Sequence, residues 1–216
     1  MLKKINIASI FKSRGKRAFI QALPYNAAVL DIGCGNNSPF VTKGLRADLH
    51  YTGIDVGNYR QTKPNLADEY LVTSPGEFAA QLEGMCTFDA VISSHNLEHC
   101  NDRDRVLVAM VKRLKPGGLL YLAFPSRHTI ELDGRAGTLN YKDDPTHIDL
   151  PPDWNTTLAR LHCEGMELLF AAQEYRPFAL SVVGAIFEPL SKFRKKVMFG
   201  TWQFHGFETI IWACKK

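Results

Sequence analysis

The sequence predicts an α/β fold in which helices cover both faces of a mostly parallel sheet. Short apolar runs alternate with helix-like stretches, a pattern typical of strand–helix–strand units. One of these runs leads directly into a glycine turn, and such sheets bind ligands at the ends of their strands. The 216 residues, 45% of them hydrophobic and 22% charged, fit a single domain over 1–216.

Strand-like runs are expected to alternate with helix-like stretches over much of the chain. The strand candidates are 27–32, 50–55, 69–73, 88–93, 118–124, 167–173 and 207–214. Helices are expected at about 7–22, 77–83, 101–114 and 153–164. Asn101 or Asp102 would cap the third of these helices, and Pro116 with Gly117 would end it.

The most informative stretch is 29–38, an apolar strand that ends in the turn Asp-Ile-Gly-Cys-Gly. Two glycines let the backbone fold tightly and approach a ligand where a Cβ would clash. A dinucleotide fingerprint asks for a third glycine three positions after the second, and that position holds Ser38. The turn therefore predicts a nucleotide-type cofactor and disfavours NAD.

A second acid supports this interpretation. Asp55 ends the strand candidate at 50–55, about twenty residues past the turn, where an acid meets ribose hydroxyls in nucleotide-binding α/β folds. One carboxylate accepts two hydroxyl hydrogen bonds at once, which suits a vicinal diol.

Two later motifs complete a series. Residues 88–99 form a strand followed by Ser-His-Asn-Leu-Glu-His, and 114–125 hold a Pro-Gly-Gly turn and a further strand. With the four motifs in this order, the chain resembles the class I S-adenosylmethionine (SAM) dependent methyltransferases. The resemblance implies a doubly wound, Rossmann-like, seven-stranded sheet with the last strand antiparallel, and SAM as cofactor.

The cofactor contacts follow from the same resemblance. The residues expected to bind SAM are Asp31, Gly33, Cys34, Gly35, Asp55, Val56, Ser74 and Ser94. One departure concerns adenine, because many relatives carry an acid after the third strand and this chain does not. Ser74 or a backbone group is expected there instead.

Histidines are the candidates for the chemistry. Methyl transfer needs positioning first, and a hydroxyl acceptor also needs a base near neutral pH. His147 and His95 are the predicted catalytic residues, with His147 as base or acceptor contact. His99 also follows the fourth strand, where a hydrogen bond at a helix start explains it as well as function does.

Residues 126–152 form a long polar connection that contains Asp143, Asp144, His147 and Asp149. Long ordered loops are usually functional, so a substrate lid is one interpretation. A divalent-metal site and a solvated turn begun by Asp-Asp-Pro are the others. The acid spacing is irregular for oxygen ligands, so no metal is predicted.

A helical insertion is expected at about 177–200. Its apolar stripe consists of Val183, Ile186, Phe187, Leu190, Phe193 and Val197, and it ends in basic residues. The expectation is a helix packed on the domain with a solvated basic end. Peripheral membrane contact through 178–197 and a dimer contact are the alternatives, whereas a span is excluded by length.

The segment 200–214, with the Asp-Asp-Pro-Thr-His loop, resembles methyltransferases of surface-polysaccharide assembly. That resemblance implies O-methylation of a saccharide or glycan intermediate. Trp202, Phe204 and Phe207 would pack on a sugar face or, as the stronger expectation, on the last strand.

Charge and cysteines limit the partners and the compartment. A net charge of +4 without long basic runs does not indicate nucleic acid. The five cysteines form no metal or disulfide pattern, which fits a reducing cytoplasm. If the basic helix binds lipid, the protein would lie at the inner face of the membrane. The segment 1–12 is interpreted as an amphipathic lead-in helix rather than a signal peptide. A monomer or homodimer is expected.

The sequence therefore favours O-methylation of a small molecule or glycan. An N- or C-methyltransferase of a small metabolite is the competing enzyme, and it would need no base at a neutral nitrogen. A SAM-binding module without catalysis, acting as a partner subunit, is the competing class. A nicotinamide oxidoreductase is the remaining alternative.

Overall fold

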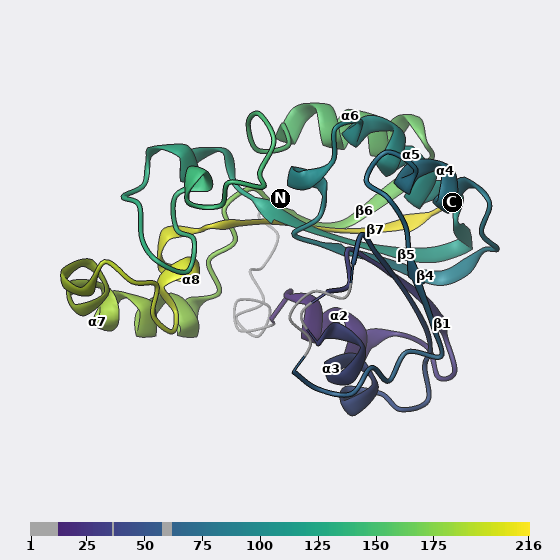
Figure 1. The fold of residues 1–216 in the computed structure, drawn as a ribbon, viewed down its shortest axis with the longest axis horizontal. Helices are drawn as coiled ribbons and strands as arrows, with labels where there is room; N and C mark the ends of the chain where they lie inside the picture. The colour runs from purple at the N-terminus through teal and green to yellow at the C-terminus, as the bar shows by residue number, and fades with distance from the viewer. Residues whose placement is uncertain (1–12, 36, 58–61) are drawn as a thin grey trace, which may run out of the picture.

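The computed structural model describes residues 13–35, 37–57 and 62–216, and its centre is one seven-stranded sheet (Figure 1). The strands are β1 (Ala28–Ile32), β2 (His50–Asp55), β3 (Glu69–Val72), β4 (Phe88–Ser94), β5 (Leu114–Pro125), β6 (Met166–Ala172) and β7 (Glu208–Lys215). Their order is β3-β2-β1-β4-β5-β7-β6, and β7 runs antiparallel to both neighbours. The predicted fold class is confirmed.

Helices lie on both faces of this sheet, as Figure 1 shows. One face carries α2 (Lys16–Ala22) and α3 (Ser38–Leu45), and the other carries α4 (Phe78–Glu83), α5 (Arg103–Lys112) and α6 (Trp154–Cys163). Beyond the sheet lie α7 (Phe178–Arg194) and α8 (Thr201–His205). Residues 7–12 of the predicted first helix lie outside the described residues. The sequence did not predict α3, because Pro39 and Gly44 in its short span weaken a helical pattern.

Strand alternation divides the core between the two helical layers. Leu30 and Ile32 of β1 pack in the cluster that includes α4 and α5, whereas Val29 packs in the cluster that includes Phe19 and Ile20 of α2. Because both faces are covered, the central strands read as continuous apolar runs.

The first and last residues of α5 can be compared with the predicted cap and the predicted end of this helix. Asp102 caps the helix by accepting a hydrogen bond from the Arg105 amide at 3.1 Å. The predicted stop at Pro116 is late, since the helix ends at Lys112 and β5 already begins at Leu114. The pairing between β4 and β5 is irregular between Phe88 and Ala90, whose partners are Leu114 and Leu119. The Pro-Gly-Gly turn lies in this irregular part of β5.

The predicted insertion forms α7, but its apolar stripe does not pack on the domain. Ile186 is 71% exposed and Phe193 is 86% exposed, while the buried residues of α7 are Gly184 and Ser191. A Cβ on Gly184 would meet the Gly200 carbonyl, so the close contact with the turn before α8 needs glycine. The expectation of a packed stripe is therefore wrong. Within the described part of the chain, no helix has the length and apolarity to cross a membrane.

Candidate functional site

A cavity of about 1080 Å³ opens where the parallel strands end. The predicted site residues that line it are Gly33, Gly35, Asp55, Val56, Ser94, His95 and His147. They come from the carboxyl ends of β1, β2 and β4 and from the 126–152 loop, so segments far apart in sequence meet at one edge of the sheet.

The glycine turn after β1 is fixed by its neighbours. Gly33 has φ +70°, and a Cβ there would lie 2.6 Å from Asn96 Cβ and Oδ1. Its amide donates a hydrogen bond to the Ile54 carbonyl at 2.9 Å, which ties the turn to β2. Only glycine meets both the backbone angle and the close approach. Asn96, which the sequence analysis did not single out, also lines the cavity.

Asp31, which precedes the glycine turn, does not line the cavity. It is fully buried, and its Oδ2 accepts hydrogen bonds from Lys16 Nζ at 2.8 Å and Tyr51 Oη at 2.7 Å. Lys16 also donates to Ser38 Oγ at 3.0 Å and lines the cavity. A single lysine at the start of a short helix gives no sequence pattern, so the role of Lys16 could not be predicted from the sequence.

Cys34 contributes its backbone to the turn, while its thiol is buried against β2. A Cβ added to Gly53 would lie 2.7 Å from Cys34 Sγ. Burial, with Asp31 and Asp55 nearby, raises the pKa of the Cys34 thiol well above its ordinary value. The side chain is therefore a small apolar group rather than a nucleophile.

Asp55 presents a prearranged carboxylate to the cavity wall. Its Oδ2 accepts a hydrogen bond from the Gly35 amide at 2.6 Å, and its Oδ1 accepts one from the Val56 amide at 2.7 Å. Burial raises the pKa of Asp55, and these two amide hydrogen bonds oppose that shift. Each carboxylate oxygen keeps a lone pair for a further donor.

Ser74 lies outside the cavity lining. Its hydroxyl donates to Glu77 Oε2 at 3.0 Å on the exposed turn before α4. Its neighbours Pro75 and Gly76 do line the cavity. This edge therefore offers backbone and apolar surface rather than the serine hydroxyl.

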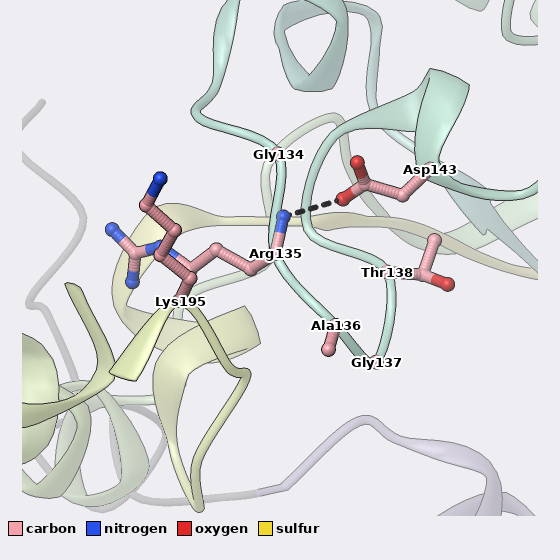
Figure 2. Close-up of a pocket in the computed structure, with 7 residues that line it drawn as sticks. All are labelled: Gly134, Arg135, Ala136, Gly137, Thr138, Asp143 and Lys195. Carbon is pink, nitrogen blue, oxygen red and sulfur yellow. Dashed lines mark hydrogen bonds between the residues drawn. The ribbon is translucent and has the colours of Figure 1, made fainter. Parts of the chain in front are cut away.

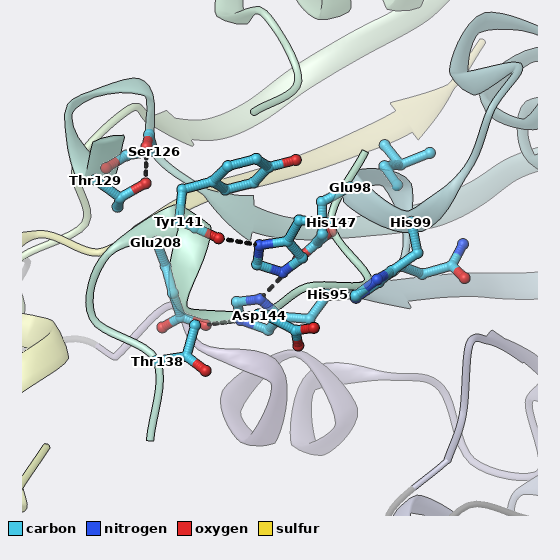
Figure 3. A network of polar contacts seen from close by, with 12 residues as sticks. His95, Glu98, His99, Ser126, Thr129, Thr138, Tyr141, Asp144, His147 and Glu208 are labelled. Atoms are coloured by element: carbon cyan, nitrogen blue, oxygen red, sulfur yellow. Dashed lines mark hydrogen bonds and ion pairs between the residues drawn. The ribbon is translucent and has the colours of Figure 1, made fainter. Parts of the chain in front are cut away.

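His95 lies between two carboxylates at the end of β4. Its Nδ1 is 3.0 Å from Glu98 Oε1, and its Nε2 is 3.0 Å from Glu208 Oε1 (Figure 3). Burial would lower the pKa of His95, but the hydrogen bonds with Glu208 and Glu98 outweigh it and raise the pKa to about 10. The geometry thus describes an imidazolium with both nitrogens engaged, which does not suit a proton acceptor.

The 126–152 loop brings His147 to the same end of the cavity. The His147 ring stacks on Tyr141 at 4.3 Å between centroids, and the His99 ring lies 4.9 Å away. Its Nδ1–H donates to the Tyr141 carbonyl at 2.6 Å. Burial lowers the pKa of His147, so the ring is held neutral with the lone pair on Nε2.

The loop is ordered by its own acids and by one arginine. Asp143 Oδ2 accepts amide hydrogen bonds from Arg135, Leu139 and Asn140, and two short 3₁₀ helices lie at Arg127–Glu131 and Tyr141–Asp143. Asp144 accepts hydrogen bonds from the amide and hydroxyl of Thr146. Arg103 of α5 donates to the carbonyls of Glu98, Ile148 and Leu150. Asp143 therefore folds the loop, whereas Asp144 orders the turn at Thr146 and also lines the cavity.

A second, smaller hollow of about 360 Å³ lies where this loop meets the end of α7 (Figure 2). Residue 136 pairs with 196 in an isolated bridge, and the Arg135 guanidinium forms an ion pair with Glu188 at 2.6 Å. The Arg135 side chain is only 3% exposed. This contact joins the loop to α7.

Comparison with known proteins gives one family. A family model described as a methyltransferase domain matches residues 8–161. A ubiquinone biosynthesis O-methyltransferase of Bartonella bacilliformis is 32% identical over 105 residues, which cover 46% of this chain and 41% of that protein. The 27-O-demethylrifamycin SV methyltransferase of Amycolatopsis mediterranei is 32% identical over 127 residues, covering 51% of this chain and 45% of that protein.

A similar solved structure is a SAM-dependent methyltransferase from Archaeoglobus fulgidus. It has a TM-score of 0.55 and 20% identity, and the match covers 94% of this chain and 96% of that chain. At this identity the likeness concerns the fold. The chain spans less than half the length of the two curated relatives.

Proposed function

The chain belongs to the methyltransferase-domain family, which confirms the enzyme class and the methyl donor predicted from the sequence, and on that premise we propose that it methylates an oxygen atom of a small molecule. One observation carries the proposal. The glycine turn with Asp55 and the histidine cluster with His147 line the same cavity, so donor and acceptor share one space.

The residues at the cofactor end fit SAM. Gly33 and Gly35 leave room for a ligand against the backbone, and Asp55 offers a fixed carboxylate to two ribose hydroxyls. Val56 and Ser94 line the same end. When bound, SAM would supply a methyl group bonded to a positively charged sulfur, and that sulfur would be the leaving group for an acceptor oxygen held in line with the bond.

Lys16 extends this set. Its ammonium lies at the cavity wall and is shared with Asp31 and Ser38, so a ligand carboxylate there meets a positive charge already in place. We assign Lys16 to the carboxylate of the amino-acid part of SAM.

At the acceptor end, His147 is the residue assigned to the acceptor oxygen. Its Nε2 carries the lone pair, because Nδ1–H is given to the Tyr141 carbonyl. Both a proton acceptor and a metal ligand need that lone pair. His95 has no free lone pair while it is charged, so its assignment becomes positioning of Glu98 and Glu208.

The choice of oxygen is supported by the relatives, whose names specify an O-methyltransferase and methylation at a 27-O position. Neither name specifies a saccharide. A glycan acceptor therefore has support from the sequence resemblance alone, and a small molecule is the preferred acceptor class.

A direct test is transfer of labelled methyl from SAM to a panel of phenols, catechols, sugars and amines, with the product atom identified by NMR. Methylated oxygen is expected, and His147→Ala should reduce turnover by on the order of 100-fold. His162→Ala, on the exposed side of α6, is the matched control. Methylated nitrogen or carbon would contradict the proposal, and SAM binding without transfer would favour a partner subunit.

Peripheral membrane contact is assigned to α7. Val182, Ile186, Leu190 and Phe193 form an exposed apolar row at spacings of three or four residues. Four basic residues lie at the end of the helix and directly after it, at 192 and 194–196, and the single acid of the helix, Glu188, is paired with Arg135. The apolar row would leave water on contact with a bilayer, and the neighbouring positive charges would be attracted to anionic headgroups.

Vesicle sedimentation tests this contact. We expect binding to phosphatidylglycerol vesicles, little binding to phosphatidylcholine, and loss of binding in Ile186→Ser with Phe193→Ser. Tyr25→Ser, an exposed aromatic outside α7, is the control. Equal binding by the α7 variant would contradict the assignment, and a concentration-dependent dimer that the variant abolishes would replace it.

A further inference from the structure

Three side chains at the acceptor end of the cavity direct ligand-type atoms at one another (Figure 3). One oxygen of Glu98 and one ring nitrogen each of His99 and His147 lie within 4.8 Å of one another. Imidazole nitrogens and a carboxylate oxygen are a common ligand set for catalytic zinc. Among the described residues no other group of three such side chains comes together in this way.

Glu98 has one carboxylate oxygen paired with the His95 imidazolium and one oxygen without a partner. The side chain is fully buried, and its Oε1 contacts His95. Its Oε2 has no hydrogen-bond partner among the described residues, although Glu98 lines the cavity. A buried carboxylate oxygen without a partner is costly, because it has lost water without gaining a donor.

The two imidazoles are oriented as metal ligands usually are. His99 Nδ1–H donates to the Thr146 carbonyl at 3.1 Å, and His147 Nδ1–H donates to the Tyr141 carbonyl at 2.6 Å. A carbonyl oxygen only accepts, and the Thr146 hydroxyl, 3.0 Å from the same His99 nitrogen, gives its own proton to Asp144. The proton therefore lies on Nδ1 and the lone pair on Nε2 in both rings. Histidines that bind metal typically give their other ring N–H to such a carbonyl.

We propose that Glu98, His99 and His147 bind one divalent cation of the Zn²⁺ type, and that this cation holds the acceptor hydroxyl for methylation. The proposal rests on the proposed function and deepens it. Three protein ligands leave a coordination position open for an oxygen in the cavity, as in catalytic zinc sites. It also revises the expectation of no metal, since these ligands come from two segments that no local spacing connects.

The cation would replace a general base, because it would make the acceptor hydroxyl acidic enough to lose its proton. Coordination lowers the pKa of a hydroxyl, so its O–H bond breaks, the proton passes to water at the cavity mouth, and the electron pair stays on oxygen. That oxygen forms the bond to the methyl carbon, while the carbon–sulfur bond breaks and leaves its pair on sulfur. His147 then acts as a ligand.

Calorimetric titration of the chelator-treated full chain with Zn²⁺ alone, and visible spectroscopy with Co²⁺ alone, test the site. We expect one ion per chain, a Co²⁺ spectrum with nitrogen ligation, and affinity reduced on the order of 100-fold in both His99→Ala and His147→Ala. His162→Ala should bind like the wild type. If the Glu98→Gln variant folds, it tests the third proposed ligand in the same way.

The outcomes separate the two proposals. No binding by folded wild type, or equal binding by the His99 and His147 variants, overturns the cation site. Methyl transfer that persists in excess chelator overturns it too, and leaves the proposed function standing. Absence of SAM binding, measured on the same samples, instead overturns the proposed function.

Discussion

The glycine turn allows a quantitative prediction, because replacing Gly33 by alanine meets two separate obstacles. A residue with a Cβ at φ +70° costs about 1–2 kcal/mol. The added Cβ would also lie 2.6 Å from Asn96, and overpacking of this kind costs about 1–3 kcal/mol. Gly33→Ala should therefore lower the free energy of unfolding by about 3 kcal/mol and weaken SAM binding.

Urea unfolding provides the assay. One variant serves as a matched control, and a second background separates the backbone cost from the cost of the contact with Asn96. Gly44→Ala lies in α3, where nothing is within 4 Å of the added Cβ, and should raise the free energy of unfolding by about 0.5–1 kcal/mol. In an Asn96→Gly background, Gly33→Ala should retain only the backbone cost, about 1–2 kcal/mol. A loss below about 0.5 kcal/mol for Gly33→Ala alone would refute the reasoning.

Three further variants probe the site and its support. Lys16→Met should weaken SAM binding tenfold or more in calorimetry, because it removes the ammonium from Asp31 and the cavity wall. Trp202→Ala should raise the acceptor KM about tenfold in steady-state assays, since the indole lines the cavity. Glu188→Gln should cost about 3 kcal/mol in urea unfolding at pH 7, because it leaves buried Arg135 unpaired. The hydrogen bond from Arg135 lowers the pKa of Glu188, so this difference should fade as pH falls below the ordinary value of 4.5.

Each variant has its own check. Lys43→Met, which breaks an ion pair outside the cavity, should leave SAM affinity unchanged, and an equal loss there would contradict the role of Lys16. Trp202→Phe keeps a ring against Phe207 and should keep most of the acceptor affinity. Trp202→Ala should not change SAM affinity. A Glu188→Gln deficit that does not shrink as the pH is lowered from 4.5 would contradict an ionic origin.

The elements with strong local signals were predicted well from the sequence. Asp102 caps α5, the strand ending at Asp55 forms β2, and the glycine turn lies at the cavity. Each of these depends on a short stretch of chain, in which capping, alternation or backbone freedom is decided locally. The seven-stranded sheet with its last strand antiparallel followed from the family resemblance rather than from any single motif.

Features that depend on distant contacts were not predictable in this way. The charge of His95 depends on Glu208, which lies more than a hundred residues away and reaches it only through strand pairing. Lys16 becomes a site residue because α2 packs beside the glycine turn. The outward stripe of α7 depends on Gly184, whose contact with Gly200 places the small residues inside. Side-chain periodicity alone cannot tell which face of a helix is buried.

The central claim is that the cavity binds SAM through the turn and Asp55, and calorimetric titration with SAM and S-adenosylhomocysteine tests it most directly. Wild type should bind on the order of micromolar, and Asp55→Ala should lose at least 100-fold in affinity. Asp55→Asn, which keeps the side-chain size, guards against misfolding, and Asp153→Ala at the start of α6 is the control. No binding by folded wild type, or unchanged binding by the Asp55 variants, would contradict the account.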